Sequence, residues 1–494
     1  MENKLGLYIT FVFYIVSMFF IGIYFYRRAK TSGISNYFLG ERQMNPWVTA
    51  LSAQSSDMSA WLFMSLPGAA YLFGYQACWI AIGLAIGTYI NWKVIARRLR
   101  NFSYAFSDSI TIPQYLQERF KSNSKLIQLV CSIVILIFFT LYIASGFSAE
   151  AKLFSEVFGM QYHTGLFIGA VIIVSYTYLG GFHAVCWTEF FQGILMFFAI
   201  ITVPIIVFFM MSESQVTQVF TKDFVWGTLF SSQHNSTVGE IVSGLGWGLG
   251  YFGMPHILVR FMAIRSSDEI KRSRKIALTW VYMTLVAAVA IGIFGHTYLS
   301  SQGITYNSQL ESETVFMHLS TMLFPPWAAG ILLSAILAAI MSTVSSQLLV
   351  LSSAMVNDIY HLYRKRTNEK RSMVLSRLAV ILVAMIGLWI AMKPDNTIMG
   401  FVQHAVSGFG ATFGPSILLS LVWKRLTELG VIAGMIAGAS SVMVWEGLSL
   451  YTTTGYTSMV PCFIFSTIVV IVGSLCTKKP SQEVTDCFDR AVNM

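Results

Sequence analysis

Long apolar stretches recur along the whole 494-residue chain, and short polar segments separate them. Each stretch is close to the roughly 20 residues that a helix needs to cross the hydrocarbon core of a bilayer. Thirteen stretches can be marked, at residues 5–26, 46–74, 75–92, 126–149, 163–181, 184–211, 239–262, 276–299, 324–352, 378–393, 398–423, 429–446 and 457–476. No linker, low-complexity tract or soluble domain interrupts them. The pattern predicts an all-α polytopic membrane protein that forms one transmembrane domain over residues 1–494.

Composition supports this prediction. The chain is 55% hydrophobic and only 11% charged, with a mean hydropathy of +0.64, whereas soluble domains carry about 25% charged residues. Leu5–Tyr26 is too long for the core of a cleavable signal peptide and ends in Arg27-Arg28 rather than in small residues. We therefore expect this stretch to be the first membrane span.

The basic residues divide unequally between alternate loops. If the first loop is cytoplasmic, basic clusters on the same side fall at 27–42, 93–100, 264–275, 363–371, 423–425 and 478–479. The opposite side keeps only Lys4, Lys152, Lys222 and Lys393. Cytoplasmic loops are enriched in Lys and Arg, so we expect an N-terminus outside and a C-terminus inside, in the plasma or inner membrane. The net charge of +9 therefore reflects topology, and no nucleic-acid partner is expected.

Two of the stretches carry helix-breaking sequences. The second contains "SSDMSA" followed by Pro67-Gly68, and the seventh, "GLGWGLGYFGMP", places five glycines and Pro255 within twelve residues. Unwound backbone at membrane depth is tolerated only where it faces a cavity or binds something. We therefore expect both helices to unwind within the membrane.

The positions of the two interrupted stretches are informative as well. They are five spans apart, so they cross the membrane in opposite directions. Interrupted helices at matching places in two halves are typical of inverted-repeat transporters that bind their solute near the midplane. The pattern predicts a core of five plus five helices with repeats near 46–211 and 239–423, and peripheral helices at 5–26, 429–446 and 457–476.

The first interrupted stretch and the ninth span offer oxygen atoms for a hard cation such as sodium. Carbonyl groups would come from the unwound part of the second span, and hydroxyls from Ser342-Thr343 and Ser345-Ser346. The alternative is that these hydroxyls bond back to their own helix. Asp57 is harder to explain this way, because a carboxylate at the bilayer centre costs about 2.5–3.5 kcal/mol on insertion scales. We expect Asp57 to have an ion-linked role.

Other ionisable residues within the spans give weaker indications of a binding site. Glu189 lies near the cytoplasmic start of its span, and we expect it to be a solvated helix end; Arg260 falls at the cytoplasmic end of the seventh span. No arginine at mid-span is thus available to hold a dianion. Six singly placed cysteines and eight dispersed histidines show no metal-ligand spacing.

The glycine-rich stretch suggests a solute site. Trp247 and Tyr251 are four residues apart and would share one face of an α-helix. Glycine permits close approach of the backbone, and the N-terminus of a half-helix suits a carboxylate. The region has few polar side chains for the hydroxyls of a sugar, each of which needs a partner once buried. A compact solute that carries a carboxylate fits this description.

With these residues in view, the chain resembles the sodium:solute symporter family over nearly its whole length. The resemblance rests on "PWVTALSAQSSDMSAWLFMSLPGA", "FFTLYIASG", "GWGLGYFGMPHILVRFM", "WAAGILLSAILAAIMSTVSSQLLVLSSA" and "GFGATFGPSILLS". It implies a core of the leucine-transporter type, with sodium as the coupling ion and L-proline as the solute taken up by alternating access. Another small zwitterion or organic acid remains the alternative.

The resemblance also implies particular binding residues. The sodium ligands would be backbone oxygens of Ser55, Met58 and Ala339 with the hydroxyls of Ser342 and Thr343, supported by Asp57. The solute pocket would be formed by Ser59, Trp61, Tyr142, Trp247, Tyr251 and Pro255. Two positions depart from the family pattern: Ala60 stands where the family has glycine, and Met254 stands where it has glutamine.

Other functional classes fit less well. A channel needs a continuous pore lined by rings of like groups, which the paired breaks do not suggest. No nucleophile–base pair, metal motif or GxxxxGK[ST] loop is present in the sequence, so we expect neither an enzyme nor a primary pump. The expected surroundings are the lipid bilayer, and no obligate protein partner is implied.

Overall fold

The computed structural model describes residues 5–28, 39–122, 124–179, 181–230, 237–360, 362, 369–393 and 397–494. The described chain is helical throughout, apart from one isolated bridge between Met44 and Ile264. The helices at the predicted spans are α1 (Leu5–Arg28), α3 (Pro46–Asp57) with α4 (Ser65–Phe73), α5 (Cys78–Ile90), α8 (Leu126–Phe158), α9 (Tyr162–Leu179), α10 (Phe182–Met210), α13 (Thr237–Gly246) with α14 (Pro255–Ala263), α15 (Ile270–Ser301), α18 (Pro326–Ser353), α20 (Glu369–Ile390), α21 (Ile398–Val422), α22 (Glu428–Gly447) and α24 (Met459–Cys476).

Helices of the described chain lie at each of the predicted spans, although fewer stretches are individually long and apolar enough to cross a membrane. Within the described residues, ten continuous helical stretches are long and apolar enough to cross a membrane. One of them, Ala60–Ala105, runs through both α4 and α5, so the ten stretches account for eleven predicted spans. The remaining two are α9 and the interrupted pair α13–α14.

Several helix ends lie beyond the predicted bounds. α8 continues to Phe158, α15 begins at Ile270, and the loops predicted at 212–238 and 300–323 contain short helices. These are α11 (Glu213–Val219), α12 (Lys222–Leu229), α16 (Gln309–Ser312) and α17 (Val315–Leu323). Local capping explains one of them, because Ser212 and Gln215 form a capping box at the start of α11.

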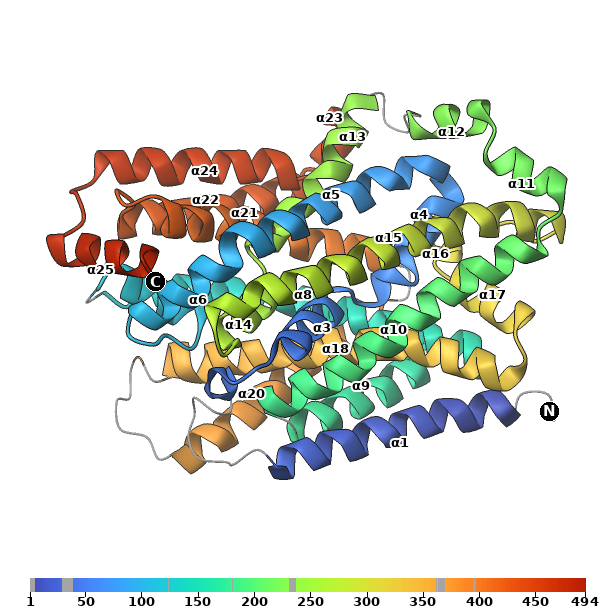
Figure 1. The fold of residues 1–494 in the computed structure, drawn as a ribbon, viewed down its shortest axis with the longest axis horizontal. Coiled ribbons are helices and arrows are strands. Elements are labelled where there is room, and N and C mark those ends of the chain that lie inside the picture. The colour runs from blue at the N-terminus through green and yellow to red at the C-terminus, as the bar shows by residue number, and fades with distance from the viewer. Residues whose placement is uncertain are drawn as a thin grey trace.

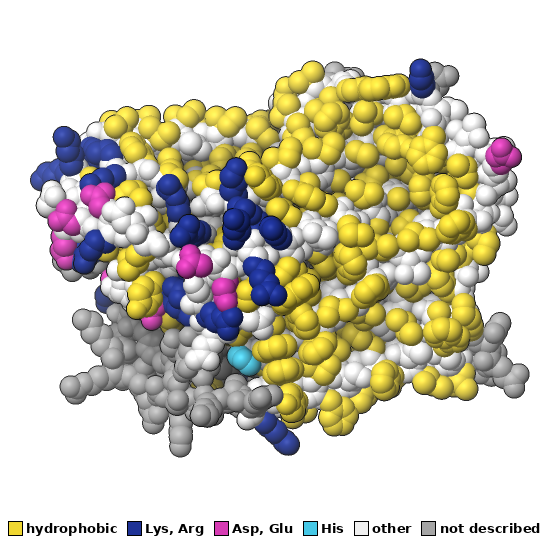
Figure 2. All heavy atoms as spheres, viewed as in Figure 1, with side chains coloured by type: hydrophobic (Ala, Val, Ile, Leu, Met, Phe, Trp, Pro, Cys, Tyr) yellow, Lys and Arg dark blue, Asp and Glu magenta, His cyan; other side chains and the backbone are white. Residues whose placement is uncertain are grey.

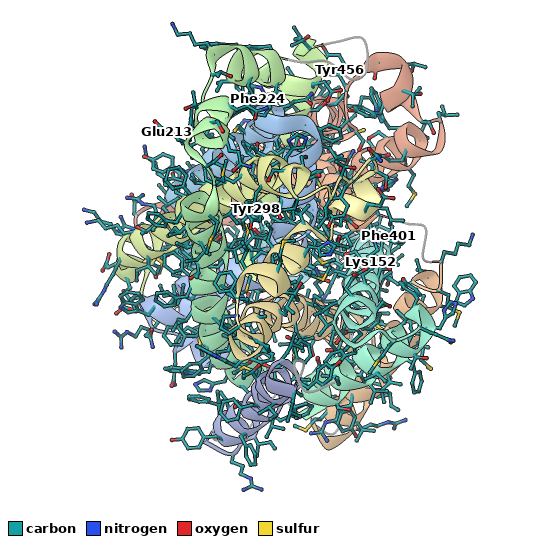
Figure 3. All side chains as sticks on the ribbon, turned by 90° about the vertical axis from the view of Figure 1, so that its right-hand side faces the viewer. Lys152, Glu213, Phe224, Tyr298, Phe401 and Tyr456 are labelled. Atoms are coloured by element: carbon teal, nitrogen blue, oxygen red, sulfur yellow. The ribbon has the colours of Figure 1, made fainter. Side chains whose placement is uncertain are left out.

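The long helices lie roughly along the long axis of the molecule (Figure 1). α1 packs against α18 and α10 at one edge, and α22 and α24 pack together against α21 at the other. The start of α1 and the C-terminal end of the chain lie at opposite ends of this axis (Figure 1). Seen down the axis from the end that carries α11 and α12, many of the helices are viewed nearly end-on (Figure 3).

The surface consists of an apolar band and one end that is rich in basic residues. Figure 2 shows apolar side chains over most of the face in view, whereas Lys and Arg gather at the end where α6 (Ala96–Ala105), α14 and α25 (Gln482–Val492) lie. Large apolar residues on the outside of the helices are widely exposed, among them Phe13 (71%), Val286 (71%) and Trp389 (71%). An exposed apolar band of this extent is suited to contact with lipid.

Candidate functional site

The first interrupted helix breaks where the sequence predicts. Asn45 caps α3 by accepting hydrogen bonds from the amides of Trp47 and Val48, and α3 ends at Asp57. Ser59 has an extended backbone, and a single turn of 3-10 helix (Ala60–Leu62) leads into α4. Every residue from Ser52 to Leu66 is buried. The break therefore exposes backbone polar groups inside the protein.

Several of the predicted sodium ligands meet at this break. The Ser342 hydroxyl, from the middle of α18, donates a hydrogen bond of 2.7 Å to the Ser55 carbonyl and lies 3.1 Å from the Ala339 carbonyl. The neighbouring Thr343 hydroxyl is buried and has no hydrogen-bond partner in the described residues. Met58 forms the C-cap of α3. This donor set consists of hydroxyl and carbonyl oxygens, the ligands that a hard cation such as sodium prefers.

Asp57 connects the break to its surroundings through both its side chain and its backbone. Asp57 is 2% exposed, and neither its Oδ2 nor the nearby Tyr251 hydroxyl has a hydrogen-bond partner among the described residues. The Asp57 carbonyl accepts hydrogen bonds from the Ser59 amide (2.9 Å), the Trp61 indole (3.3 Å) and the Tyr142 hydroxyl (3.3 Å). Asp57 therefore connects the candidate sodium-binding residues with the candidate solute-binding residues.

The second interrupted helix breaks by a different route. α13 passes into a 3-10 segment, Trp247–Phe252, and α14 begins at Pro255 without a side-chain cap. A Cβ on Gly248 would lie 2.1 Å from the Gly83 carbonyl, and one on Gly253 would lie 2.1 Å from the Phe409 carbonyl. The glycines therefore serve close packing against α5 and α21.

The shared face predicted for Trp247 and Tyr251 is wrong. A 3-10 helix has three residues per turn, so residues four apart point about 120° away from each other. Tyr251 lies near Asp57 and Tyr142, whereas no hydrogen bond or ring contact between Trp247 and the other predicted pocket residues occurs in the described chain. The structure brings together Asp57, Ser59, Trp61, Tyr142 and Tyr251. Pro255 lines a cavity that also includes Arg260.

The expectation of a solvated Glu189 is also wrong. Glu189 is fully buried, and Arg260 is 1% exposed. One guanidinium nitrogen of Arg260 donates to both carboxylate oxygens, at 2.8 and 2.9 Å, and the hydroxyls of Ser52 and Ser346 also donate to the carboxylate. Ser55 donates to the Glu189 carbonyl at 3.0 Å. A buried charge requires such partners, and this ion pair joins α3, α10, α14 and α18.

A further buried carboxylate, Glu150, was not anticipated. It is fully buried between α8 and α9, its two oxygens have no hydrogen-bond partner in the described chain, and a Cβ on Gly169 would lie 2.3 Å from its Cδ. The predicted span ended at residue 149, just before it. The run of apolar residues that continues after the "AEAK" segment was the available signal.

Two oppositely placed interrupted helices, with hydroxyls from a third helix at the first break, define a secondary transporter that couples a solute to a cation. Comparison with known proteins identifies the group. Residues 37–438 match the sodium:solute symporter family, and the chain belongs to that family. It is therefore a membrane transporter and not an enzyme, as predicted.

Curated relatives cover the chain almost completely. It is 46% identical over 473 residues to the high-affinity proline transporter PutP of Bacillus subtilis, covering 96% of this chain and 98% of the relative. It is 43% identical over 495 residues to the sodium/proline symporter of Escherichia coli, covering 98% of this chain and 95% of that protein.

Solved structures confirm the fold class. A sodium-coupled sialic acid symporter in its substrate-bound outward-open state superposes with a TM-score of 0.77 at 19% identity, over 97% of this chain and 99% of the other. The nucleobase-cation-symport-1 transporter MHP1 superposes with a TM-score of 0.54 at 13% identity, over 93% and 99% of the two chains. The chain thus has the helical fold shared by these coupled transporters.

Proposed function

We propose that this protein couples inward movement of sodium to uptake of L-proline by alternating access. The observation that carries the proposal is the meeting of the Ser342 hydroxyl with the Ser55 and Ala339 carbonyls at the first break, beside the buried Asp57. Relatives that are named as proline transporters and are 40–46% identical over nearly the full length support proline as the solute.

The sodium ion would be held by the backbone oxygens of Ser55, Met58 and Ala339 and the hydroxyls of Ser342 and Thr343. The unpartnered Thr343 hydroxyl supports this assignment, because a buried hydroxyl without a partner costs free energy that an ion would recover. Asp57 would offset the charge of the ion through the field inside the protein.

The proline ring would lie against Tyr142, Trp61 and Tyr251, with Trp247 and Pro255 on the second broken helix and Ser59 beside the first. The N-terminus of α14 would offer the His256 amide to the solute carboxylate, because Pro255 has no N–H and the Ile257 and Leu258 amides bond to the Met254 carbonyl. Met254, the N-cap of α14, is 1% exposed, so it would act on affinity through packing.

The orientation would place the C-terminus in the cytoplasm and the N-terminus outside. The gathering of Lys and Arg at the end that carries the C-terminus supports it (Figure 2). The predicted basic cluster at 363–371 lies largely outside the described residues, as do Lys4 and Lys30. We also assign the two repeats to residues 46–211 and 239–423, because each begins with an interrupted helix.

The energetics suit solute accumulation. A tenfold sodium gradient supplies about 1.4 kcal/mol, and a potential of 100 mV adds about 2.3 kcal/mol for each charge moved. One sodium ion per proline therefore permits accumulation of a few hundredfold.

Uptake of labelled proline into proteoliposomes tests the proposal. A sodium gradient should drive uptake, and choline should not replace sodium. Asp57→Asn should remove most of the sodium-driven uptake. Unlabelled proline should compete better than alanine, betaine, glucose or pantothenate. Equal uptake in choline and sodium would contradict sodium coupling, whereas stronger competition by another of these solutes would favour the alternative substrate class.

A further inference from the structure

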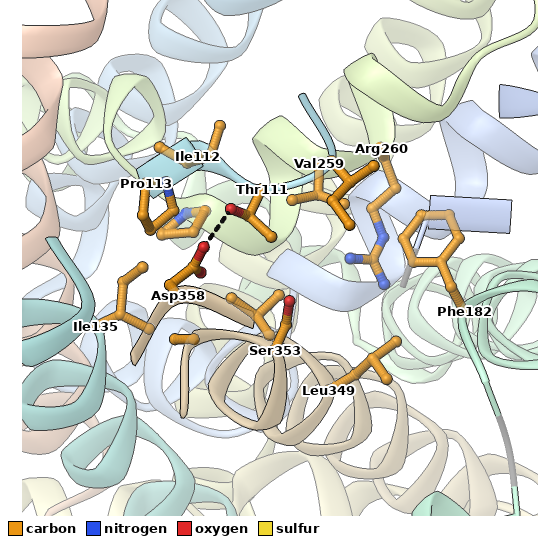
Figure 4. Close-up of a pocket in the computed structure, with 14 residues that line it drawn as sticks. Thr111, Ile112, Pro113, Ile135, Phe182, Val259, Arg260, Leu349, Ser353 and Asp358 are labelled. Atoms are coloured by element: carbon orange, nitrogen blue, oxygen red, sulfur yellow. Dashed lines mark hydrogen bonds between the residues drawn. The ribbon is translucent and has the colours of Figure 1, made fainter. Parts of the chain in front are cut away.

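A small cavity lies at the end of the molecule that carries the basic residues, between α14, α18 and the segment before α7 (Ile112–Arg119). Its volume is about 20 Å³, roughly the space of one water molecule. Pro255 is among the residues that line it. Arg260 lies on one side of the cavity, and Thr111, Ser353 and Asp358 lie on the other (Figure 4). The remaining wall is mostly apolar. The cavity therefore lies between the proposed solute pocket and the cytoplasm.

Asp358 is the charged group at the cytoplasmic side of this cavity. It is 1% exposed, and Oδ1 accepts hydrogen bonds from the Thr111 hydroxyl (2.8 Å) and the Gln128 amide (2.9 Å). Oδ2 is buried and has no hydrogen-bond partner in the described chain. The Arg260 guanidinium is already engaged by Glu189, Ser52 and the His256 carbonyl. Among the described residues, Oδ2 of Asp358 thus has neither a hydrogen-bond donor nor a counter-charge.

A π-helical segment places Asp358 beside the cavity. After Ser353 the α-helix continues as π-helix, Ala354–Tyr360, and an extra residue per turn shifts which side chains share a face. Asp358 consequently lines the same cavity as Leu349 and Ser353. Local π-helical turns occur often at functional sites.

The hydroxyl groups of α18 lead from the proposed sodium site to this carboxylate. Ser342 contacts the Ser55 carbonyl, Ser346 contacts Glu189 and Arg260, and Ser353 lines the cavity. Their spacings of four and seven residues place them on one face of the helix. Asp358 follows sixteen residues after Ser342, or roughly 24 Å along the axis at 1.5 Å per residue.

We propose that Asp358, with Ser353 and Thr111, forms a transient cation site at which sodium pauses after leaving the main site and before it enters the cytoplasm. The free Oδ2 and the two hydroxyls supply the oxygen ligands that sodium prefers. An ion that loses its primary ligands would otherwise cross an apolar cavity unpaired, at high electrostatic cost. This inference rests on the proposed function, because it requires sodium to be the transported cation.

The test measures release separately from binding. In proteoliposomes, Asp358→Asn should slow net sodium-driven proline uptake at least tenfold and raise severalfold the internal sodium concentration that half-inhibits uptake. The sodium dependence of proline binding at equilibrium should stay within twofold of the wild type, because the main site is intact. Asp358→Glu keeps the charge and should restore part of the rate. Ser353→Ala should show a smaller change in the same direction.

Asp268→Asn is the matched control, since it removes a carboxylate at the same end whose side chain is 83% exposed, and it should leave all three quantities unchanged. Wild-type rates and wild-type internal sodium inhibition in Asp358→Asn would overturn the inference. An equal loss of equilibrium binding and uptake would overturn it too, by showing a structural role. If Asp358→Asn does not reach the membrane, unchanged internal sodium inhibition in both Asp358→Glu and Ser353→Ala would overturn it.

Failure of the proposed function would look different. A wild-type protein that binds no proline in sodium would contradict proline symport before any variant is compared. Efflux of radioactive sodium from the same vesicles would then test the release site alone, with slower efflux expected in Asp358→Asn and equal efflux contradicting the inference.

Discussion

The two interrupted helices break for opposite reasons. Around the first break, the polar groups of Ser55, Asp57 and Ser342 replace the lost helical hydrogen bonds. Around the second, glycine lets the backbone pack directly against neighbouring helices, as Gly248 does against Gly83. The comparison shows that a helix can be opened inside a membrane protein either by offering polar partners or by removing side chains. A polar break suits an ion, and a closely packed one can shape a wall for an organic solute.

The largest effect on stability is expected at the buried ion pair between Glu189 and Arg260, which joins α3 to the neighbouring helices. Glu189→Gln would leave Arg260 buried without its counter-charge, and breaking a buried pair in this way costs about 3–5 kcal/mol. Thermal unfolding of the purified protein should therefore show a strongly lowered midpoint. Asp489→Asn, which breaks an exposed pair with Lys424, is the control and should hardly change it. Equal midpoints for the two variants would contradict a stabilising role for the buried pair.

A smaller loss of stability is expected at the second, closely packed break. Gly248→Ala adds a methyl group within 2.1 Å of the Gly83 carbonyl, and overpacking of this kind typically costs about 1–3 kcal/mol. The unfolding midpoint should fall, while Gly227→Ala, where no atom lies within 4 Å of the added carbon, should leave it unchanged or raise it. A stable Gly248→Ala protein would show that α5 and the 3-10 segment can separate without cost.

A smaller effect, on function rather than folding, distinguishes the two breaks chemically. Thr343→Ala and Ser342→Ala each remove one proposed sodium ligand and should raise the sodium concentration for half-maximal uptake about tenfold, equivalent to about 1.4 kcal/mol. Proline affinity at saturating sodium should change much less. Ser334→Ala is the control, because within the described residues that hydroxyl bonds to its own helix, at the Gly330 carbonyl. Sodium dependence that is the same in all three variants would favour ordinary helix back-bonding.

The smallest effect is expected at the hydrogen bond that joins the proposed solute pocket to the proposed sodium site. Tyr142→Phe removes one hydrogen bond to the Asp57 carbonyl, worth about 0.5–1.5 kcal/mol. Because the tyrosine belongs to the proposed solute pocket and the carbonyl to the ion-binding break, apparent affinities for proline and sodium should both weaken by a few-fold. Titrations of each ligand at fixed concentrations of the other measure this. A change confined to one ligand would show that the two sites are independent at this point.

The sequence predicted the features that depend on local pattern. Apolar length located the spans, and the residues around Asp57 and the glycines before Pro255 located both breaks within a few residues. The pairing of Glu189 with Arg260 escaped prediction because it joins side chains 71 residues apart, and a single sequence carries no sign of such contacts. The relative directions of Trp247 and Tyr251 were missed because the local helix is 3-10, and its tighter winding depends on packing against α5 and α21.

The Asp57 carbonyl, fixed by three donors, has a consequence for which ions the protein accepts. The peptide group that follows Asp57 is held from the backbone, from Trp61 and from Tyr142, so it cannot swing outward without losing hydrogen bonds. The neighbouring carbonyls of Ser55 and Met58 are then restrained to a narrow range of separations. A potassium ion needs longer metal–oxygen distances than sodium and would have to bend this framework, whereas a sodium ion would not. We expect discrimination between alkali cations to arise here from the stiffness of the backbone.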